Sequence, residues 1–71
     1  MFDGGIDMNY ARAIKDLRDI LLLSQDELAK LLDVSVQTVN RWENDKHEPT
    51  IKAKRKLKKL FDENNIVMEV K

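Results

Sequence analysis

Three polar side chains of types that bind nucleotide bases lie close together at positions 37, 40 and 41. Gln37, Asn40 and Arg41 occur at helical spacing with Val39 and Trp42, so they point outward if the apolar pair faces inward. An amide presents a hydrogen-bond donor and an acceptor together, which matches the edge of adenine, and a guanidinium can bind O6 and N7 of guanine. These residues are therefore candidates for reading the base pairs of duplex DNA.

Two short helices joined by a tight turn are predicted to position these side chains. The sequence Ser24-Gln25-Asp26-Glu27 is a capping box, and it predicts the start of a helix that presents four apolar residues, Leu28, Ala29, Leu31 and Leu32. Asp33 can take the left-handed conformation at the end of this helix. Ser35 can then cap a second helix over about residues 35–44. This is the helix-turn-helix pattern, in which the second helix enters the major groove.

The rest of the chain predicts two more helices and a tail. A first helix begins near Tyr10, and a fourth begins after Pro49, where Thr50 can act as the N-cap. Residues 66–70 alternate in the manner of a strand. We therefore expect an all-α, four-helix domain over residues 9–62, preceded by a flexible arm at 1–8 and followed at 63–71 by a short C-terminal β-strand.

Length and composition exclude several classes of protein. The 71 residues contain no cysteine, so one small domain is expected, without a disulfide framework or a thiolate zinc site. The longest apolar stretch, residues 20–23, is far shorter than the roughly 20 residues that span a membrane. We expect a cytoplasmic protein with no membrane contact. Because there is no glycine-rich phosphate loop and only one histidine, we also expect no enzymatic activity and no cofactor.

Charge is distributed unevenly, although 13 basic and 13 acidic side chains balance to a net charge of zero. Residues 1–33 carry a net charge of −3, residues 34–61 carry +5, and residues 62–71 carry −2. The basic block coincides with the segment that holds the candidate base contacts, which favours an anionic partner. Six basic residues between positions 52 and 59 could equally form a solvated helix face.

The stretch from 24 to 49, SQDELAKLLDVSVQTVNRWENDKHEP, resembles the phage Cro/repressor-like, or xenobiotic-response-element-like, helix-turn-helix domain. The resemblance extends over about residues 9–61 and implies a lambda-repressor-like fold. It departs from the family pattern at Leu22, Asp33 and Asp45, which stand where the family often has glycine at helix ends. Since a branched Leu tolerates positive φ poorly, we expect local strain there.

The resemblance implies a role for particular residues of this chain. It implies base contacts from four residues of the helix predicted over residues 35–44, namely Val36, Gln37, Asn40 and Arg41. It implies phosphate contacts from Gln25, Ser35, Thr38, Asn44 and Lys46, and an amide-bearing residue at a helix start is also suited to bind an anion. It further implies a structural ion pair between Arg18 and Glu43. We expect Trp42 to lie in the core, and we expect His47 to be solvated or near phosphate without binding a metal.

Three functional hypotheses follow. The first is a sequence-specific, double-stranded DNA-binding transcriptional regulator of the repressor type, acting as a homodimer, with residues 65–70 pairing between the two copies. The second is an antitoxin or another interaction module whose tail strand pairs with a protein partner such as a toxin. The third is the DNA-targeting domain of a larger protein.

Overall fold

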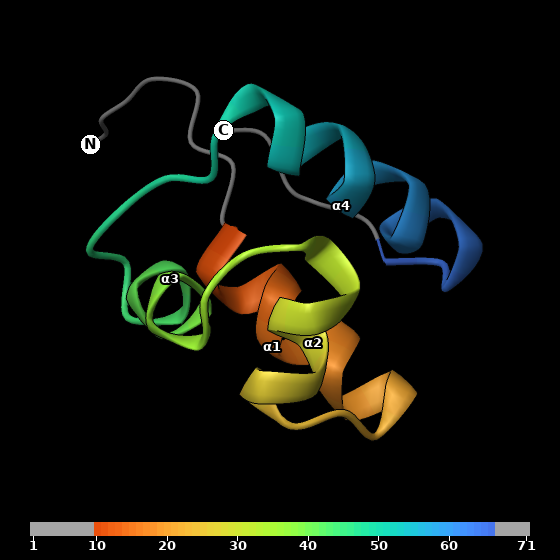
Figure 1. Cartoon of the computed structure of the whole chain (residues 1–71). Helices are drawn as coiled ribbons and strands as arrows, with labels where there is room; N and C mark the ends of the chain where they lie inside the picture. Colours follow the sequence, from red (N-terminus) through yellow and green to blue (C-terminus); the bar gives the residue numbers. More distant parts are fainter. Residues whose placement is uncertain (1–9, 67–71) are drawn as a thin grey trace, which may run out of the picture.

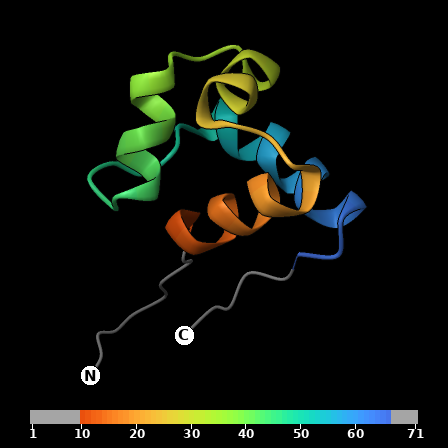
Figure 2. The same ribbon diagram turned by 90° about the horizontal axis from the view of Figure 1, so that it is seen from below.

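In the part of the chain that the structure describes, four α-helices pack around one apolar core (Figure 1). The computed structural model describes residues 10–66, in which the helices are α1 (Tyr10–Leu21), α2 (Gln25–Leu32), α3 (Val36–Glu43) and α4 (Ile51–Glu63). Both α3 and α4 pack against α1 and α2, which form the middle of the domain. Figure 2 shows the domain from below, with α3 at one side and α1 crossing beneath. Among the described residues none lies in a strand, and no helix is long and apolar enough to cross a membrane.

The start of each of the last three helices is determined by a capping side chain. Ser24 accepts a hydrogen bond from the Glu27 amide (3.1 Å), and the Glu27 carboxylate accepts one from the Ser24 amide (2.8 Å), which completes the predicted capping box. Ser35 caps α3 and Thr50 caps α4 in the same way, each with its hydroxyl accepting from an amide three residues on. The predicted caps are confirmed.

All four helices end with the same backbone arrangement. A residue in the left-handed region follows each helix, namely Leu22, Asp33, Asp45 and Asn65, with φ between 58° and 60°. The amide of the next residue then donates to a carbonyl five positions back, at 2.8 to 2.9 Å. These are the bonds of the Schellman motif, which satisfies the last carbonyls of a helix. The positive φ expected at the first three positions is confirmed, whereas Asn65 was not anticipated from the sequence.

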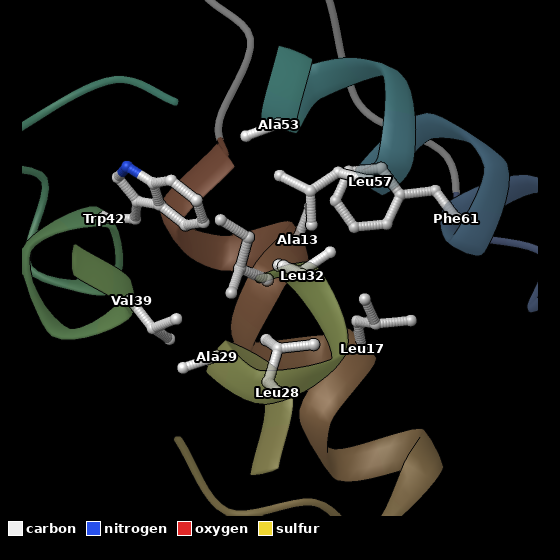
Figure 3. Close-up of a cluster of buried hydrophobic side chains, with 11 residues drawn as sticks. Ala13, Leu17, Leu28, Ala29, Leu32, Val39, Trp42, Ala53, Leu57 and Phe61 are labelled. Carbon is white, nitrogen blue, oxygen red and sulfur yellow. The ribbon is translucent and has the colours of Figure 1, made fainter. Parts of the chain in front are cut away.

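The core consists of one apolar stripe from each helix (Figure 3). Ile14, Leu17, Leu28, Val39 and Leu57 are fully buried, and Trp42 lies among them at 3% exposure. The expectation that Trp42 is a core residue is confirmed. Of the four apolar residues that the sequence places on α2, Leu31 is 53% exposed. It precedes Leu32, which takes the inward position on that helix turn.

The C-terminal strand expected over residues 66–70 lies outside the described residues, apart from Ile66. That residue is not part of a strand: it packs against the core, and its amide donates to the carbonyl of Phe61 at 2.8 Å. Ile66 therefore belongs to the C-terminal cap of α4. Any strand made by the tail has to begin after it.

A bidentate ion pair connects α1 to the end of α3. Arg18 Nε and Nη2 donate to the two carboxylate oxygens of Glu43 at 2.6 and 2.9 Å, and Arg18 Nη1 donates to the Leu23 carbonyl at 3.1 Å. The Glu43 side chain is only 3% exposed. Burial by itself would raise the pKa of Glu43, but hydrogen bonds from Arg18 and Gln25, together with the charges of Arg18 and Lys15, outweigh it and lower that pKa.

Leu22→Gly is expected to stabilise the domain. Leu22 has φ 58° and its side chain is 87% exposed, so the substitution relieves strain and removes almost no packing. A left-handed residue costs about 1 to 2 kcal/mol, and the extra freedom of glycine in the unfolded chain costs about 0.5 to 1. Urea unfolding should show a net gain of about 0.5 to 1 kcal/mol. Leu22→Ala is the matched control, because it keeps Cβ and should give no such gain. A loss of stability in Leu22→Gly would contradict the assignment.

Stability should depend on pH through Glu43. Because folding lowers the pKa of this carboxyl below its ordinary value of 4.5, its contribution is complete above about pH 4.5 and is lost as pH falls through the folded-state pKa. At pH 7 the Glu43→Gln variant should be less stable than wild type by about 1 to 3 kcal/mol. Urea titrations between pH 7 and pH 3 should show this difference shrinking toward low pH. A difference that stays constant over that range would contradict the role of the ionised carboxylate.

Candidate nucleic-acid interface

The outer face of α3 carries the four predicted base-contact residues. Gln37, Asn40 and Arg41 are exposed, and Val36 at the start of the helix is 39% exposed. Behind them Val39 and Trp42 are buried at 0% and 3% exposure, so the orientation of α3 is determined by its packing. The four side chains thus stand on the surface of a helix that is anchored along its opposite face. This is the arrangement that a groove-binding helix requires.

The predicted phosphate contacts lie around the two ends of α3 and at the start of α2. Ser35 and Thr38 share a hydrogen bond between their hydroxyls (2.8 Å), and the Ser35 hydroxyl also caps α3. Asn44 and Lys46 are exposed where α3 ends. Gln25 is half-buried at the first residue of α2, next to amides that have no partner within their own helix.

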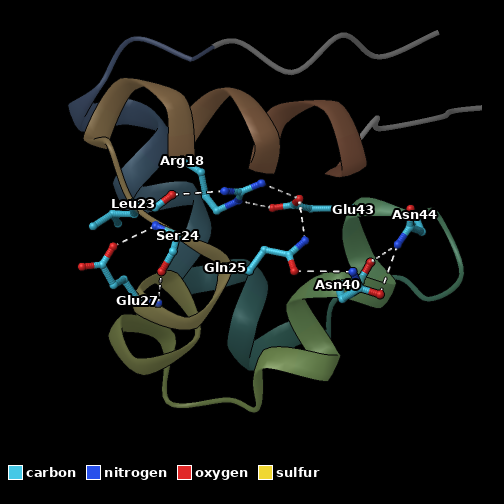
Figure 4. A network of polar contacts seen from close by, with 8 residues as sticks. All are labelled: Arg18, Leu23, Ser24, Gln25, Glu27, Asn40, Glu43 and Asn44. Atoms are coloured by element: carbon cyan, nitrogen blue, oxygen red, sulfur yellow. Dashed lines mark hydrogen bonds and ion pairs between the residues drawn. The ribbon is translucent and has the colours of Figure 1, made fainter.

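A chain of polar contacts joins three of these residues to the ion pair (Figure 4). Gln25 Nε2 donates to Glu43 Oε1 at 3.0 Å, and Asn40 Nδ2 lies 3.4 Å from Gln25 Oε1. Asn44 Nδ2 donates to Asn40 Oδ1 at 3.2 Å. The predicted ion pair between Arg18 and Glu43 is present, but its link to Gln25 and Asn40 was not predicted from the sequence. The network therefore holds the first residue of α2 against the outer face of α3.

The turn between α2 and α3 determines how the two helices are arranged. Asp33 is left-handed at φ 60° and ψ 46°, and its amide donates to carbonyls in the last turn of α2. Val34 packs against the core, and its amide donates to the Ala29 carbonyl at 2.9 Å. Ser35 then begins α3. Only three residues separate the helices. Their conformation is restricted by these backbone hydrogen bonds and by the packing of Val34.

The basic residues of α4 divide into two groups. Lys54 pairs with Glu48 and lies over the Tyr10 ring, 5.2 Å from its centroid, while Lys56 Nζ donates to the Leu32 carbonyl at 3.3 Å. These two lysines make contacts within the fold. The others, Lys52, Arg55, Lys58 and Lys59, are exposed. His47 is also exposed, and within residues 10–66 no group of three potential ligands could hold a metal ion.

Comparison with known protein families gives a match. A family model described as helix-turn-helix matches residues 14–63, which is more than two thirds of the chain. No curated protein and no solved structure matches the chain. The matched range includes all four helices apart from the first residues of α1. The chain therefore belongs to the helix-turn-helix family of the Cro/repressor type, a family of DNA-binding transcription regulators.

Proposed function

We propose that the chain is a sequence-specific regulator that inserts α3 into the major groove of duplex DNA. The observation that carries this proposal is the exposure of Gln37, Asn40 and Arg41 directly above the buried Val39 and Trp42. An eight-residue helix is about 12 Å long and about 10 Å wide, which suits a groove about 12 Å across. The protein acts by occupying its site, and not by chemistry on the DNA.

The residues divide into those that select sequence and those that hold the backbone. Arg41 donates to the O6 and N7 atoms of guanine, Gln37 and Asn40 bind adenine edges, and Val36 meets a thymine methyl group. Phosphate oxygens are bound by the residues that flank α3, namely Gln25, Ser35, Thr38, Asn44 and Lys46. The polar network supports this division, because it holds the Gln25 side chain, at the first residue of α2, close to Asn40 on the outer face of α3 (Figure 4).

We propose that the DNA-binding unit is a homodimer. Three or four side chains on one short helix define only a few base pairs, and a twofold pair of such helices about 34 Å apart doubles the site. The sequence predicts a strand over residues 66–70. Because Ile66 belongs to the cap of α4, we propose that the two copies pair through residues 67–70. If each subunit neutralises about three or four phosphates, affinity falls with salt at a log–log slope of about −5 to −7.

Two substitutions should separate base reading from phosphate binding. Arg41→Ala should relax the preference at one base pair of each half-site by about 1 to 3 kcal/mol. Lys46→Ala should weaken binding to all duplexes about equally, because phosphates are the same in every sequence. The measurement is selection from a random duplex pool, followed by titration of the selected sites and of scrambled duplexes.

Lys58→Ala is a matched control for the loss of a positive charge. Lys58 is exposed and pairs only loosely with Asp62 (3.5 Å), toward the end of α4 that lies away from α3 (Figure 1). It should leave the sequence preference unchanged. If wild-type protein at low salt binds selected and scrambled duplexes equally, the proposal of sequence-specific reading is rejected.

Deletion of residues 67–71 tests the dimer. The truncated chain keeps Ile66 and the cap of α4, so the helical domain should remain folded. We expect sedimentation to show a monomer. Binding to the two half-sites should no longer be cooperative, and it should no longer depend on the spacing between them. A truncated chain that stays dimeric and binds the same palindrome would assign the tail to another role, such as pairing with a protein partner.

A further inference from the structure

A nearly buried carboxylate determines how a side-chain amide is oriented at the interface. Glu43 Oε1 accepts from Arg18 Nη2 (2.9 Å) and from Gln25 Nε2 (3.0 Å), and the residue is 4% exposed. An ionised carboxylate has no hydrogen to donate. Gln25 must therefore turn its NH2 group toward Glu43. Its oxygen, Oε1, is then directed away from the carboxylate.

The orientation of the Gln25 amide in turn determines the orientation of the Asn40 amide on the outer face of α3. Gln25 Oε1 faces Asn40 Nδ2 at 3.4 Å, a position in which only a donor fits. On the other side Asn44 Nδ2 donates to Asn40 Oδ1 at 3.2 Å and to the Asn40 carbonyl at 2.9 Å. The nitrogen of the Asn40 amide is thus held toward Gln25, and its oxygen toward Asn44. One N–H and one lone pair of this amide remain available for a base.

The direction of the Asn40 amide matters because bases are polar along their edges. Adenine presents an acceptor, N7, beside a donor, the N6 amino group. An asparagine reads it only if the donor of the amide faces N7 and the acceptor faces N6. Reversal of the amide would place two donors together and two acceptors together, which removes the discrimination.

We propose that Glu43 is a positioning residue for base recognition, fixing the direction of the Asn40 amide through Gln25. This inference rests on the proposed function, since it assigns a cause to the preference of one reading residue. Glu43 also stabilises the fold through Arg18. The two roles can be separated, because Arg18 donates to Glu43 but does not contact Gln25 or Asn40 in the network.

Two variants of the full chain divide the roles. Glu43→Gln introduces an amide that can either donate or accept, so Gln25 is no longer held in one orientation. Arg18→Met is the matched control: it breaks the ion pair but leaves a carboxylate that still accepts from Gln25. Because loss of Arg18 raises the pKa of Glu43, all variants are compared at about pH 8, where the carboxyl is ionised. Both variants should unfold at lower urea concentration than wild type. Only Glu43→Gln should change how bases are discriminated.

The experiment uses four duplexes that differ at the one base pair whose preference is lost in Asn40→Ala. Wild type and Arg18→Met should discriminate at this pair by about 5-fold or more, and Glu43→Gln by less than about 2-fold. In an Asn40→Ala background, Glu43→Gln should have no further effect on discrimination. NMR of the free protein gives a second readout: the Gln25 side-chain NH2 should show one slowly exchanging hydrogen in wild type and Arg18→Met, but not in Glu43→Gln.

The possible results are distinct. If Glu43→Gln keeps the wild-type discrimination, the positioning role is overturned while the proposed function stands. If Glu43→Gln does not fold, Gln25→Met decides, because it leaves the Arg18–Glu43 pair in place: loss of discrimination at the Asn40 pair supports the inference, and retention overturns it. If wild type distinguishes no duplexes at all, the proposed function fails, and the inference fails with it.

Discussion

The buried carboxylate at the end of α3 is the interaction on which the arrangement of three helices depends. Glu43 binds Arg18 from α1 and Gln25 from α2, and all three hydrogen bonds lie between 2.6 and 3.0 Å. A carboxylate removed from water is costly unless its oxygens are satisfied. The three helices must therefore keep the geometry that satisfies it. Among the described residues no buried side-chain nitrogen or oxygen lacks a partner, so this polar centre is fully satisfied.

The local structure was largely predictable from the sequence, because its signals are local. Each N-cap of α2, α3 and α4 binds an amide three residues away, within a single turn. The left-handed residues Leu22, Asp33 and Asp45 are local features as well, because each lies at the end of its own helix. Helical spacing also predicted that Trp42 would be buried and that Gln37 and Arg41 would be exposed. Spacing did not show that Leu31 is exposed while Leu32 is buried, because it does not tell which of two adjacent leucines faces a neighbouring helix.

The polar network was not predictable from the sequence in the same way. Gln25 and Glu43 are separated by 18 positions, and their contact exists only because α2 and α3 pack together. The resemblance implied that Arg18 and Glu43 pair, and that Gln25 binds phosphate, as separate roles. Sequence spacing has no means of showing that one carboxylate serves both residues. That link requires the crossing of the helices to be known.

Among the described residues, the ends of four helices rest on left-handed residues that are not glycine. Each retains a side chain where the backbone would favour none, and Leu22 does so with 87% of its surface in water. A domain of this size has few kilocalories to spare. We expect a larger share of molecules to be unfolded at any moment than in a domain whose helices end in glycine. Cellular proteases cleave unfolded molecules, so modest heating should lower the abundance of the protein while most molecules are still folded.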